Sequence, residues 1–216
     1  MTRRDNDGER WDPVAGVNGR SLVSRTVGTD PCGALAIARS IEHPWYRCQA
    51  LAEVVDHLDD GRQKSAIIKE ALNAAMENAE PNRIVSVSAW PLKVLLDNGG
   101  VREFSRQIER LLRILLAEPN PVRRQDAAVI LVRHIPDMPE EPLRAVLRAF
   151  EAACGEGLGW KTGYNLRWMA ELLNARDHEK AVELALMCKN LRSKRRALRA
   201  IGEKELAEKY YEADHP

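Results

Sequence analysis

The side chains of this sequence that could bind a metal ion or act as general bases include five histidines and four cysteines. A metal site needs several such side chains at short, regular spacings, because three or four of them must reach the ion together. No histidines here share a metal-binding spacing, and no two cysteines form a C-x-x-C pair. The sequence therefore predicts no metal site. The residues concerned are His43, His57, His134, His178, His215, Cys32, Cys48, Cys154 and Cys188.

These side chains have structural interpretations instead. His43 directly precedes a proline and is expected to cap a helix. His57 and His134 fall in last turns, where a histidine suits the helix dipole. Cys48 and Cys188 fall on or beside apolar stripes. We therefore expect the cysteines to be small buried hydrophobic residues in a reducing compartment rather than disulfide partners.

Carboxylates that could act as catalytic acids and bases are plentiful, as in Asp59-Asp60 and Glu140-Glu141, but they fall at turns and helix starts. In such places they solvate the chain and cap helices. The nucleophile-elbow, P-loop, zinc-protease and dinucleotide-binding glycine motifs are all absent from the sequence. We therefore predict a protein that is not an enzyme and that carries no cofactor.

Basic side chains recur near the starts of one series of predicted helices. A cation at a helix N-terminus opposes the helix dipole at a cost of roughly a few tenths of a kcal/mol, so its recurrence needs a reason. Two explanations are open: pairing with acids of the adjoining turns, such as Glu80, Glu118 and Asp126, or contact with an anionic partner along a groove. These cations, called the basic edge below, are Arg47, Arg83, Arg123, Arg124, Lys161, Arg192, Lys194, Arg195 and Arg196.

The tryptophans divide into two groups. Trp45, Trp90 and Trp168 lie in or beside apolar helix stripes and are expected in the core or in the wall of a groove. Trp160 follows a glycine-rich segment, where an exposed aromatic side chain could anchor a partner. The candidate binding residues are therefore Trp160 and every member of the basic edge except Arg47.

A repeated helical pattern of about 38 residues positions these side chains. Apolar residues at i, i+3, i+4 and i+7 are typical of a helix with one buried face. Such stripes alternate between two series, called outer and inner, that together predict five helix pairs. The outer stripes begin at Ala34, Leu72, Ile108, Leu143 and Ala181. The inner stripes begin at Leu51, Ala89, Ala128 and Leu166, and a shorter fifth inner helix is expected near 192–201.

Prolines and glycines mark the ends of these helices. Gly61 and Gly99-Gly100 fit helix C-termini. Two segments fit the pattern less well. Residues 84–88 alternate like a strand ahead of Pro91, so we expect a kink or split near Trp90-Pro91, and 154–159, with three glycines, predicts a long, mobile turn. The prolines expected in first helical turns are Pro31, Pro44, Pro81, Pro121 and Pro139.

Residues 111–135, which read LLRILLAEPNPVRRQDAAVILVRHI, resemble a HEAT repeat. In that family a polar turn joins two helices and leads into Val-Arg and an Ala-rich face, here Val122-Arg123 and Ala127-Ala128. The resemblance covers about residues 31–201 and implies an all-α, right-handed superhelix of about five helix pairs. Such proteins are scaffolds, adaptors and, in one branch, DNA-repair glycosylases, so the resemblance implies a range of functions. TPR units are the competing family, but their sequence pattern is absent.

The two ends of the chain depart from the repeat. Residues 1–29 are polar and glycine-containing, without a helical period, and predict a flexible leader from which Trp11 alone contacts the body. Residues 30–216 predict a single helical-repeat domain. Its last segment, from Gly202 onward, is expected to cap the open end, with Leu206 and Tyr210 facing the preceding helix pair.

Composition limits the classes of partner and the compartment. With a net charge of +1, the whole chain favours neither nucleic acid nor an anionic membrane. The longest uncharged run, 84–92, is far shorter than the roughly 20 residues that cross a bilayer, and the first residues contain no apolar stretch suited to a signal peptide. We therefore expect a soluble, cytoplasmic protein.

The leading functional interpretation is a non-enzymatic scaffold or adaptor that binds another protein over an extended curved surface. The alternative is binding of nucleic acid through its phosphate backbone. That alternative rests on charge segregation, because the inner helices from Arg83 to Arg199 carry mostly cations, whereas the outer helices hold most of the acids.

Overall fold

The computed structural model describes residues 11–157 and 159–212, and within these residues it contains twelve α-helices and no strand. The all-α prediction is confirmed. In chain order, the helices are α1 (Pro13–Thr26), α2 (Pro31–Ser40), α3 (Pro44–Val55), α4 (Gly61–Met76), α5 (Pro81–Asp97), α6 (Val101–Leu116), α7 (Pro121–His134), α8 (Glu140–Glu156), α9 (Trp160–Leu173), α10 (His178–Leu186), α11 (Leu191–Ala200) and α12 (Lys204–Glu212).

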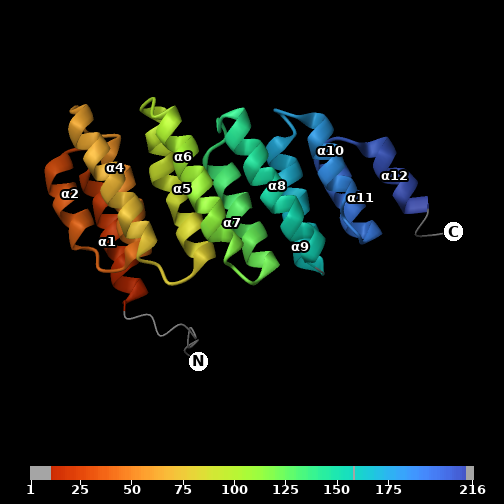
Figure 1. Ribbon diagram of the computed structural model, residues 1–216, viewed down its shortest axis with the longest axis horizontal. Helices are drawn as coiled ribbons and strands as arrows, with labels where there is room; N and C mark the ends of the chain where they lie inside the picture. The colour runs from red at the N-terminus through yellow and green to blue at the C-terminus, as the bar shows by residue number, and fades with distance from the viewer. Residues whose placement is uncertain (1–10, 158, 213–216) are drawn as a thin grey trace.

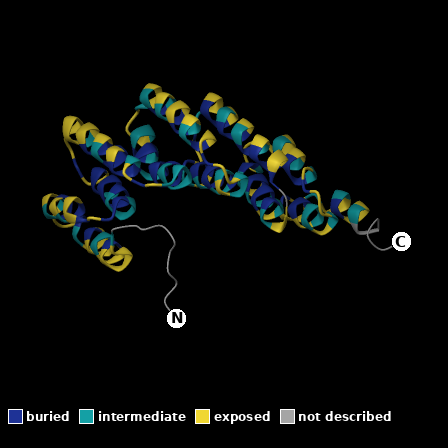
Figure 2. Cartoon of the chain, turned by 60° about the horizontal axis from the view of Figure 1, so that its bottom comes forward, coloured by how far each residue is buried: buried dark blue, intermediate teal, exposed yellow. Residues whose placement is uncertain are grey.

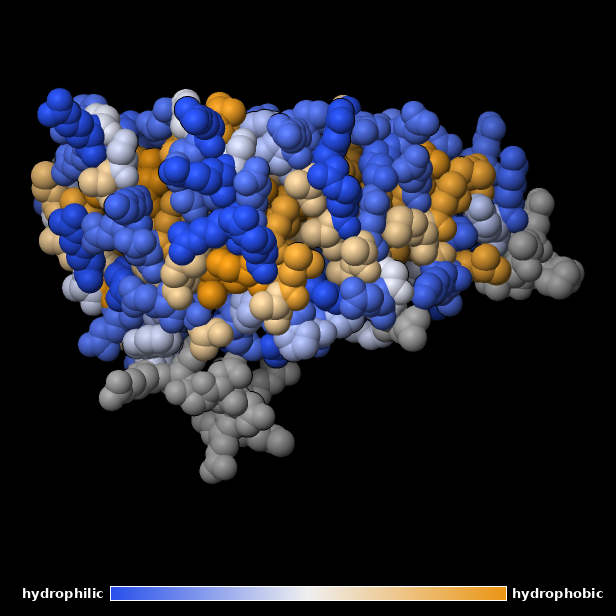
Figure 3. Space-filling model, viewed as in Figure 1, coloured by the Kyte–Doolittle hydropathy of each residue, from blue (hydrophilic) through white to orange (hydrophobic). Residues whose placement is uncertain are grey.

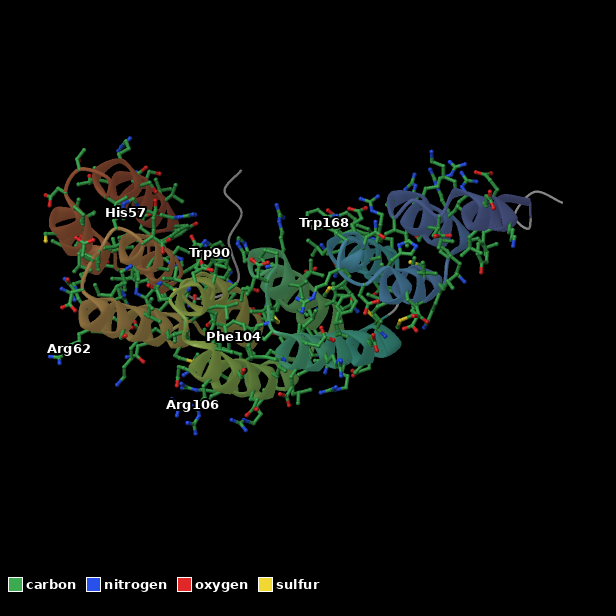
Figure 4. All side chains as sticks on the ribbon, turned by 90° about the horizontal axis from the view of Figure 1, so that it is seen from above. His57, Arg62, Trp90, Phe104, Arg106 and Trp168 are labelled. Carbon is green, nitrogen blue, oxygen red and sulfur yellow. The ribbon has the colours of Figure 1, made fainter. Side chains whose placement is uncertain are left out.

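The helices pack mainly on their neighbours in the sequence, side by side along the long axis of the molecule (Figure 1). Helices α3, α5, α7, α9 and α11 contact one another in succession and form one layer. Helices α2, α4, α6, α8 and α10 form a second layer, which packs against the first. Seen from above, the two layers bend into an arc, with Trp90 and Trp168 on the concave side and Arg106 on the convex side (Figure 4).

The apolar stripes of the sequence mark the buried faces of ten of these helices. The first residues of all nine predicted stripes are buried, among them Ala34 in α2, Leu51 in α3 and Leu166 in α9. Figure 2 shows the buried residues on the facing sides of the helices and the exposed residues on their outer sides. The predicted outer series corresponds to α2, α4, α6, α8 and α10, and the inner series to α3, α5, α7, α9 and α11.

Most of the predicted start signals act as expected. The Asp30 side chain accepts a hydrogen bond of 2.8 Å from the N–H of Gly33, with Pro31 as the first residue of α2. His43 accepts at 3.3 Å, through Nδ1, from the N–H of Trp45. Pro44, Pro81 and Pro121 are the first residues of their helices, whereas Pro139 lies one position earlier, as the N-cap residue of α8.

The predicted glycine signals had mixed outcomes. The N–H of Gly99 donates to the carbonyl of Leu96 at 2.9 Å, and that of Gly100 donates to the carbonyl of Leu95 at 3.0 Å. This pattern ends α5 and needs a residue with positive φ, which Gly99 supplies at +79°. Gly61 was expected at a helix end and is instead the first residue of α4, because the preceding aspartate caps that helix.

The prediction of a flexible leader is wrong for residues 13–26, which form α1. Asp12 accepts a hydrogen bond of 2.8 Å from the N–H of Val14, and Pro13 is the first helical residue. This is the same combination of cap and proline that starts α2. Residues 1–10 lie outside the described residues, and Trp11 lies with its ring 6.0 Å from that of His43.

The glycines of α1 bring this helix close to α2 and α3 rather than making it flexible. A Cβ atom at Gly16 would lie 2.3 Å from Cδ2 of Tyr46, and one at Gly19 would lie 2.8 Å from Cγ1 of Ile41. Neither glycine could be replaced without moving a packed side chain. The sequence signal for flexibility was therefore a signal for close packing.

One predicted irregularity is shorter than expected, and the predicted cap is present. α5 continues without a split through Pro91, and residues 84–88 are helical, as the repeat register favours. α8 continues to Glu156, so the connection expected over 154–159 is shorter than predicted. At the other end, α12 packs on α11, with Leu206 and Tyr210 partly buried against the core. Residues 213–216 lie outside the described residues.

Candidate partner-binding site

Several members of the basic edge form ion pairs with acids of adjoining turns. Arg83 Nε lies 2.9 Å from Glu80 Oε2, and Arg123 pairs with the other oxygen of the same carboxylate. Lys161 Nζ lies 3.4 Å from Asp126 Oδ1. Two of these three pairs join successive helices of the inner layer. They match the first of the two explanations that the sequence left open.

Two further arginines reach across to the end of the next outer helix. Arg47 of α3 pairs with Glu77 after α4, and Arg124 of α7 pairs with Glu156 in the last turn of α8. Glu118, which the sequence offered as another ion-pair partner, is buried and accepts a hydrogen bond of 3.0 Å from the backbone N–H of Asn120.

The remaining predicted cations lie on α11. Lys194 Nζ lies 4.9 Å from the centroid of the Tyr210 ring. Arg195 is half-buried on the same helix. Arg192 and Arg196 are exposed, and neither forms an ion pair within the part of the chain that the structure describes. Arg192 and Arg196 thus lie at the C-terminal end of the inner layer without an acidic partner among the described residues.

These two arginines line a pocket of about 560 Å³ between α9 and α11, called the α9–α11 pocket below. Trp160 lines it too and is 78% exposed. Lys189, in the turn before α11, adds a third cation, and no Asp or Glu is among the described residues that line the pocket. The pocket therefore combines positive charge with an exposed aromatic ring.

The inner surface of the α9–α11 pocket is apolar and small. Leu166 and Cys154 are buried there, and Met187, after α10, is 38% exposed. Gly163 contributes no side chain at all, and a Cβ atom there would lie 3.1 Å from Cβ of Ser193 in α11. Glycine at this position therefore lets α9 and α11 approach each other closely beside the pocket.

The helix positions that form an ion pair at two earlier junctions hold other residues beside the pocket. Arg47 and Arg124 each occupy the fourth position of an inner helix, and Gly163 occupies that position in α9. Those arginines meet acids at the ends of α4 and α8, whereas Met187 follows α10. The ion pair is therefore absent at this junction, as it is between α5 and α6, where Ile84 takes the fourth position.

The first position of α9 differs in the same way. Prolines begin α3, α5 and α7, but Trp160 begins α9. The residue before it, Gly159, has φ +116° and ψ −177°, a conformation open essentially to glycine alone. No side chain caps α9, so the positive end of its dipole lies at the edge of the pocket.

The chemistry of the pocket is suited to binding. Cys154 is the thiol among the described lining residues, and burial raises the pKa of that thiol to about 12. The thiol is therefore protonated at neutral pH and unreactive. Cationic side chains around an apolar surface can instead hold a ligand that carries negative charge and an apolar group.

Trp45, Trp90 and Trp168 are half-buried, and Trp90 and Trp168 lie on the concave side of the arc (Figure 4). The rings of Trp45 and Trp90 are 6.3 Å apart, and the guanidinium of Arg133 lies 5.0 Å from the ring of Trp168. The ring of His134 lies 4.0 Å from that of Trp90. In the space-filling view, hydrophobic side chains appear among hydrophilic ones along the length of the molecule (Figure 3).

Two expectations for titratable side chains need correction. Burial lowers the pKa of His134, and the charges of Arg133 and Arg20 lower it further. The ring is therefore neutral at pH 7 and does not supply the charge expected to suit the dipole. Three cysteines are buried as predicted, but Cys32 is exposed. All four are free thiols.

Within residues 11–157 and 159–212, no three side chains of His, Cys, Asp or Glu gather as metal ligands would. The same residues include no helix with the length and apolar character that crossing a membrane requires.

Sequence reasoning identified three of the residues that line the pocket, namely Trp160, Arg192 and Arg196. It missed Lys189, Met187 and Gly163. A signal was present, because aligning the inner helices on their first positions shows where proline and arginine give way to tryptophan and glycine.

Comparisons with models of protein families, with curated proteins and with solved structures found no match to this chain.

Proposed function

We propose that this protein is a non-enzymatic scaffold or adaptor that binds another protein, built as a HEAT-like, right-handed superhelix of about five helix pairs and acting in the cytoplasm. The architecture supports this proposal, because each inner helix contacts the next and the outer helices pack against the inner layer. A curved row of helices offers a long concave surface to a partner.

The observation that carries this proposal is the exposed indole of Trp160 beside the α9–α11 pocket. Tryptophan and arginine are the residues most enriched at the energetic centres of protein interfaces. Here one tryptophan and two unpaired arginines, Arg192 and Arg196, surround the same apolar hollow. The non-enzymatic part of the proposal is supported by the protonated thiol of Cys154, which leaves the pocket without an activated nucleophile.

Affinity capture from the native cell followed by mass spectrometry tests the proposal. The bait is the full chain, compared with Trp160→Ala and with the double variant Arg110→Ala/Arg113→Ala on α6, whose arginines are exposed and far from α11 along the chain. We expect a partner protein that the wild-type chain and the α6 variant recover and that Trp160→Ala loses. Its purified form should bind the purified chain directly. Turnover of a small molecule without recovery of any partner would overturn the proposal.

Nucleic-acid binding remains a second candidate because of the positive charge on α11. That helix carries five cations and no acid among its ten residues. If several of them contact phosphates, affinity for duplex DNA must fall with salt at a log–log slope near −0.9 per contact. A gel-shift titration at low and physiological salt checks this candidate. Absent binding at low salt, or binding unchanged when Arg123, Arg124, Arg195 and Arg196 become Ala, would remove it.

A further inference from the structure

We infer that the α9–α11 pocket receives an acidic segment of the partner protein, in which one apolar side chain is flanked by carboxylates. The inference rests on the proposed function, because it names the kind of segment that such a partner would present. It is carried by three features of the pocket: its apolar inner surface, its unpaired cations and the position that it occupies in the row of helices.

The inner surface selects an apolar side chain. Leu166 is buried at the base, Met187 is partly exposed at the side, and the indole of Trp160 stands at the mouth. A volume of about 560 Å³ is ample for one large apolar side chain together with the backbone that carries it. Contact with such a side chain would remove apolar surface of the tryptophan from water, which favours binding.

The surrounding charges select carboxylates on either side of that apolar residue. Lys189, Arg192 and Arg196 line the pocket, and within the described part of the chain no acid lines it with them. Arginine forms paired hydrogen bonds with a carboxylate, and such charge-assisted bonds are stronger than neutral ones. A cationic segment would meet like charge at all three positions, so charge complementarity requires that the bound segment of the partner be negatively charged.

The pocket lies where the chain supplies no described acid to its own cations. At two earlier junctions, an arginine in the fourth position of the inner helix meets an acid at the end of the next outer helix: Arg47 with Glu77, and Arg124 with Glu156. The junction of α9 with α10 lacks this pair, as does the junction of α5 with α6, where Ile84 holds the fourth position. Beside α9, however, cations of α11 line a pocket, no acid is among its described lining residues, and the partner segment supplies the carboxylates.

The pairing of the other cations favours a short acidic segment over a long polyanion. Arg123, Arg124 and Lys161 are already paired with acids of the chain. Arg192 and Arg196, which have no acidic partner among the described residues, therefore place their positive charge at one end rather than along the row. A duplex needs contacts spread along its phosphates, whereas a peptide segment needs only one pocket.

A short fluorescein-labelled peptide with a central leucine flanked by glutamates tests the inference by fluorescence polarisation with the full chain. We expect saturable binding that weakens at least about threefold between about 50 mM and about 300 mM NaCl. Peptides with alanine in place of leucine, or lysine in place of glutamate, should each bind at least about tenfold more weakly. A single-stranded oligonucleotide serves as the polyanion probe, and tighter binding of that probe than of the acidic peptide would overturn the inference.

Variants of the chain locate the binding. We expect Arg192→Ala/Arg196→Ala to weaken peptide binding about tenfold or more, and Arg110→Ala/Arg113→Ala on α6 to change it less than about twofold. Met187→Glu places an acid directly after α10, as Glu77 directly follows α4, and it should compete for the same arginines and weaken binding about tenfold. Met187 is partly exposed, so this variant should fold, which the helical circular dichroism signal checks.

The outcomes separate this inference from the proposed function. If no acidic peptide binds, or if the α6 control loses as much affinity as the α11 variant, the inference is wrong. Capture of a partner protein by the wild-type chain would still stand in that case. If affinity capture recovers no partner protein, the proposed function as a scaffold is wrong. Peptide binding would then show only that the pocket has affinity for acidic peptides.

Discussion

The Sγ atom of Cys48 in α3 lies 3.5 Å from the backbone carbonyl oxygen of Val87 in α5. In a regular helix that carbonyl accepts the N–H four residues on, but this residue is Pro91, which has no N–H. The thiol therefore occupies a buried acceptor that the proline leaves open. Burial raises the pKa of Cys48 well above its usual range, so the thiol keeps the proton that it donates.

We predict that Cys48→Ala lowers the free energy of unfolding by about 1–3 kcal/mol, because it removes a buried sulfur and leaves the Val87 carbonyl unpaired. In a Pro91→Ala background, the new N–H takes the carbonyl, and the same substitution should cost at least about 0.5 kcal/mol less. Urea unfolding of the four chains, followed by circular dichroism, measures the coupling. Equal costs in the two backgrounds would show that the thiol does not compensate for the proline.

Glu80 joins two inner helices by pairing with Arg83 of its own helix and Arg123 of the next. Its side chain is 19% exposed, so the pairs are less screened by water than ordinary surface pairs. We predict that Glu80→Gln lowers the free energy of unfolding by about 1 kcal/mol. The control is Glu171→Gln, which breaks a pair between neighbouring turns of α9 and should cost less than about 0.5 kcal/mol.

The measurement for Glu80 is urea unfolding at about 50 mM and about 1 M NaCl, because salt screens the charges and should narrow the difference between wild type and Glu80→Gln. A cost no larger than that of Glu171→Gln would mean that the shared carboxylate does not hold the two helices together.

His134 gives the stability a dependence on pH whose sign follows from its surroundings. Its pKa is lowered, first by burial and then by Arg133 and Arg20. The folded chain therefore binds fewer protons at this site than the unfolded chain does. Stability must then fall as pH drops through the unfolded value of about 6.5, because protonation favours the unfolded state.

We predict that His134→Gln flattens this dependence. Between about pH 7.5 and pH 5.5, wild type should lose more free energy of unfolding than the variant, and the other titrating groups cancel in the comparison. Urea midpoints at three pH values within that range measure it. Parallel curves for the two chains would mean that His134 titrates alike in the folded and unfolded states.

The helices could be predicted because their buried stripes are local features of the sequence. Ala34, Leu72 and Leu166 lie at helical spacing from their neighbours, and burial of each stripe follows from that spacing alone. α1 was missed because Gly16 and Gly19 lower helix propensity, and their reason is a contact with Tyr46 and Ile41 that no local pattern states.

The candidate site was partly predictable for the same reason. Trp160, Arg192 and Arg196 stood out by residue type, but whether an arginine is free depends on which acids the fold brings near it. In the sequence, Arg123 and Lys161 look no different from Arg192 and Arg196. In the fold, however, Arg123 is paired with Glu80 and Lys161 with Asp126. The pocket itself arises from two helices about 30 residues apart in the chain, and a single sequence offers only the alignment of inner helices as a sign of it.

Gly157 ends α8 beside this pocket, where two buried polar groups leave no room for a side chain. A Cβ atom there would lie 2.5 Å from Gln125 Nε2 and 2.7 Å from Thr162 Oγ1. The same amide nitrogen donates to the carbonyl of Ala153 at 3.0 Å and to the Thr162 hydroxyl at 3.3 Å. Since Gln125 is fully buried, its amide has no solvent-exposed position to which it could move.

We predict that Gly157→Ala lowers the free energy of unfolding by about 1–3 kcal/mol, because it crowds the amide and breaks at least one of these hydrogen bonds. Gly61→Ala is the matched control: no atom would lie within 4 Å of its Cβ, and alanine in the first turn of α4 should be neutral or stabilise by up to about 1 kcal/mol. Thermal and urea unfolding measure both. Equal stabilities of the two variants would mean that the Gln125 amide does not fix the connection between α8 and α9.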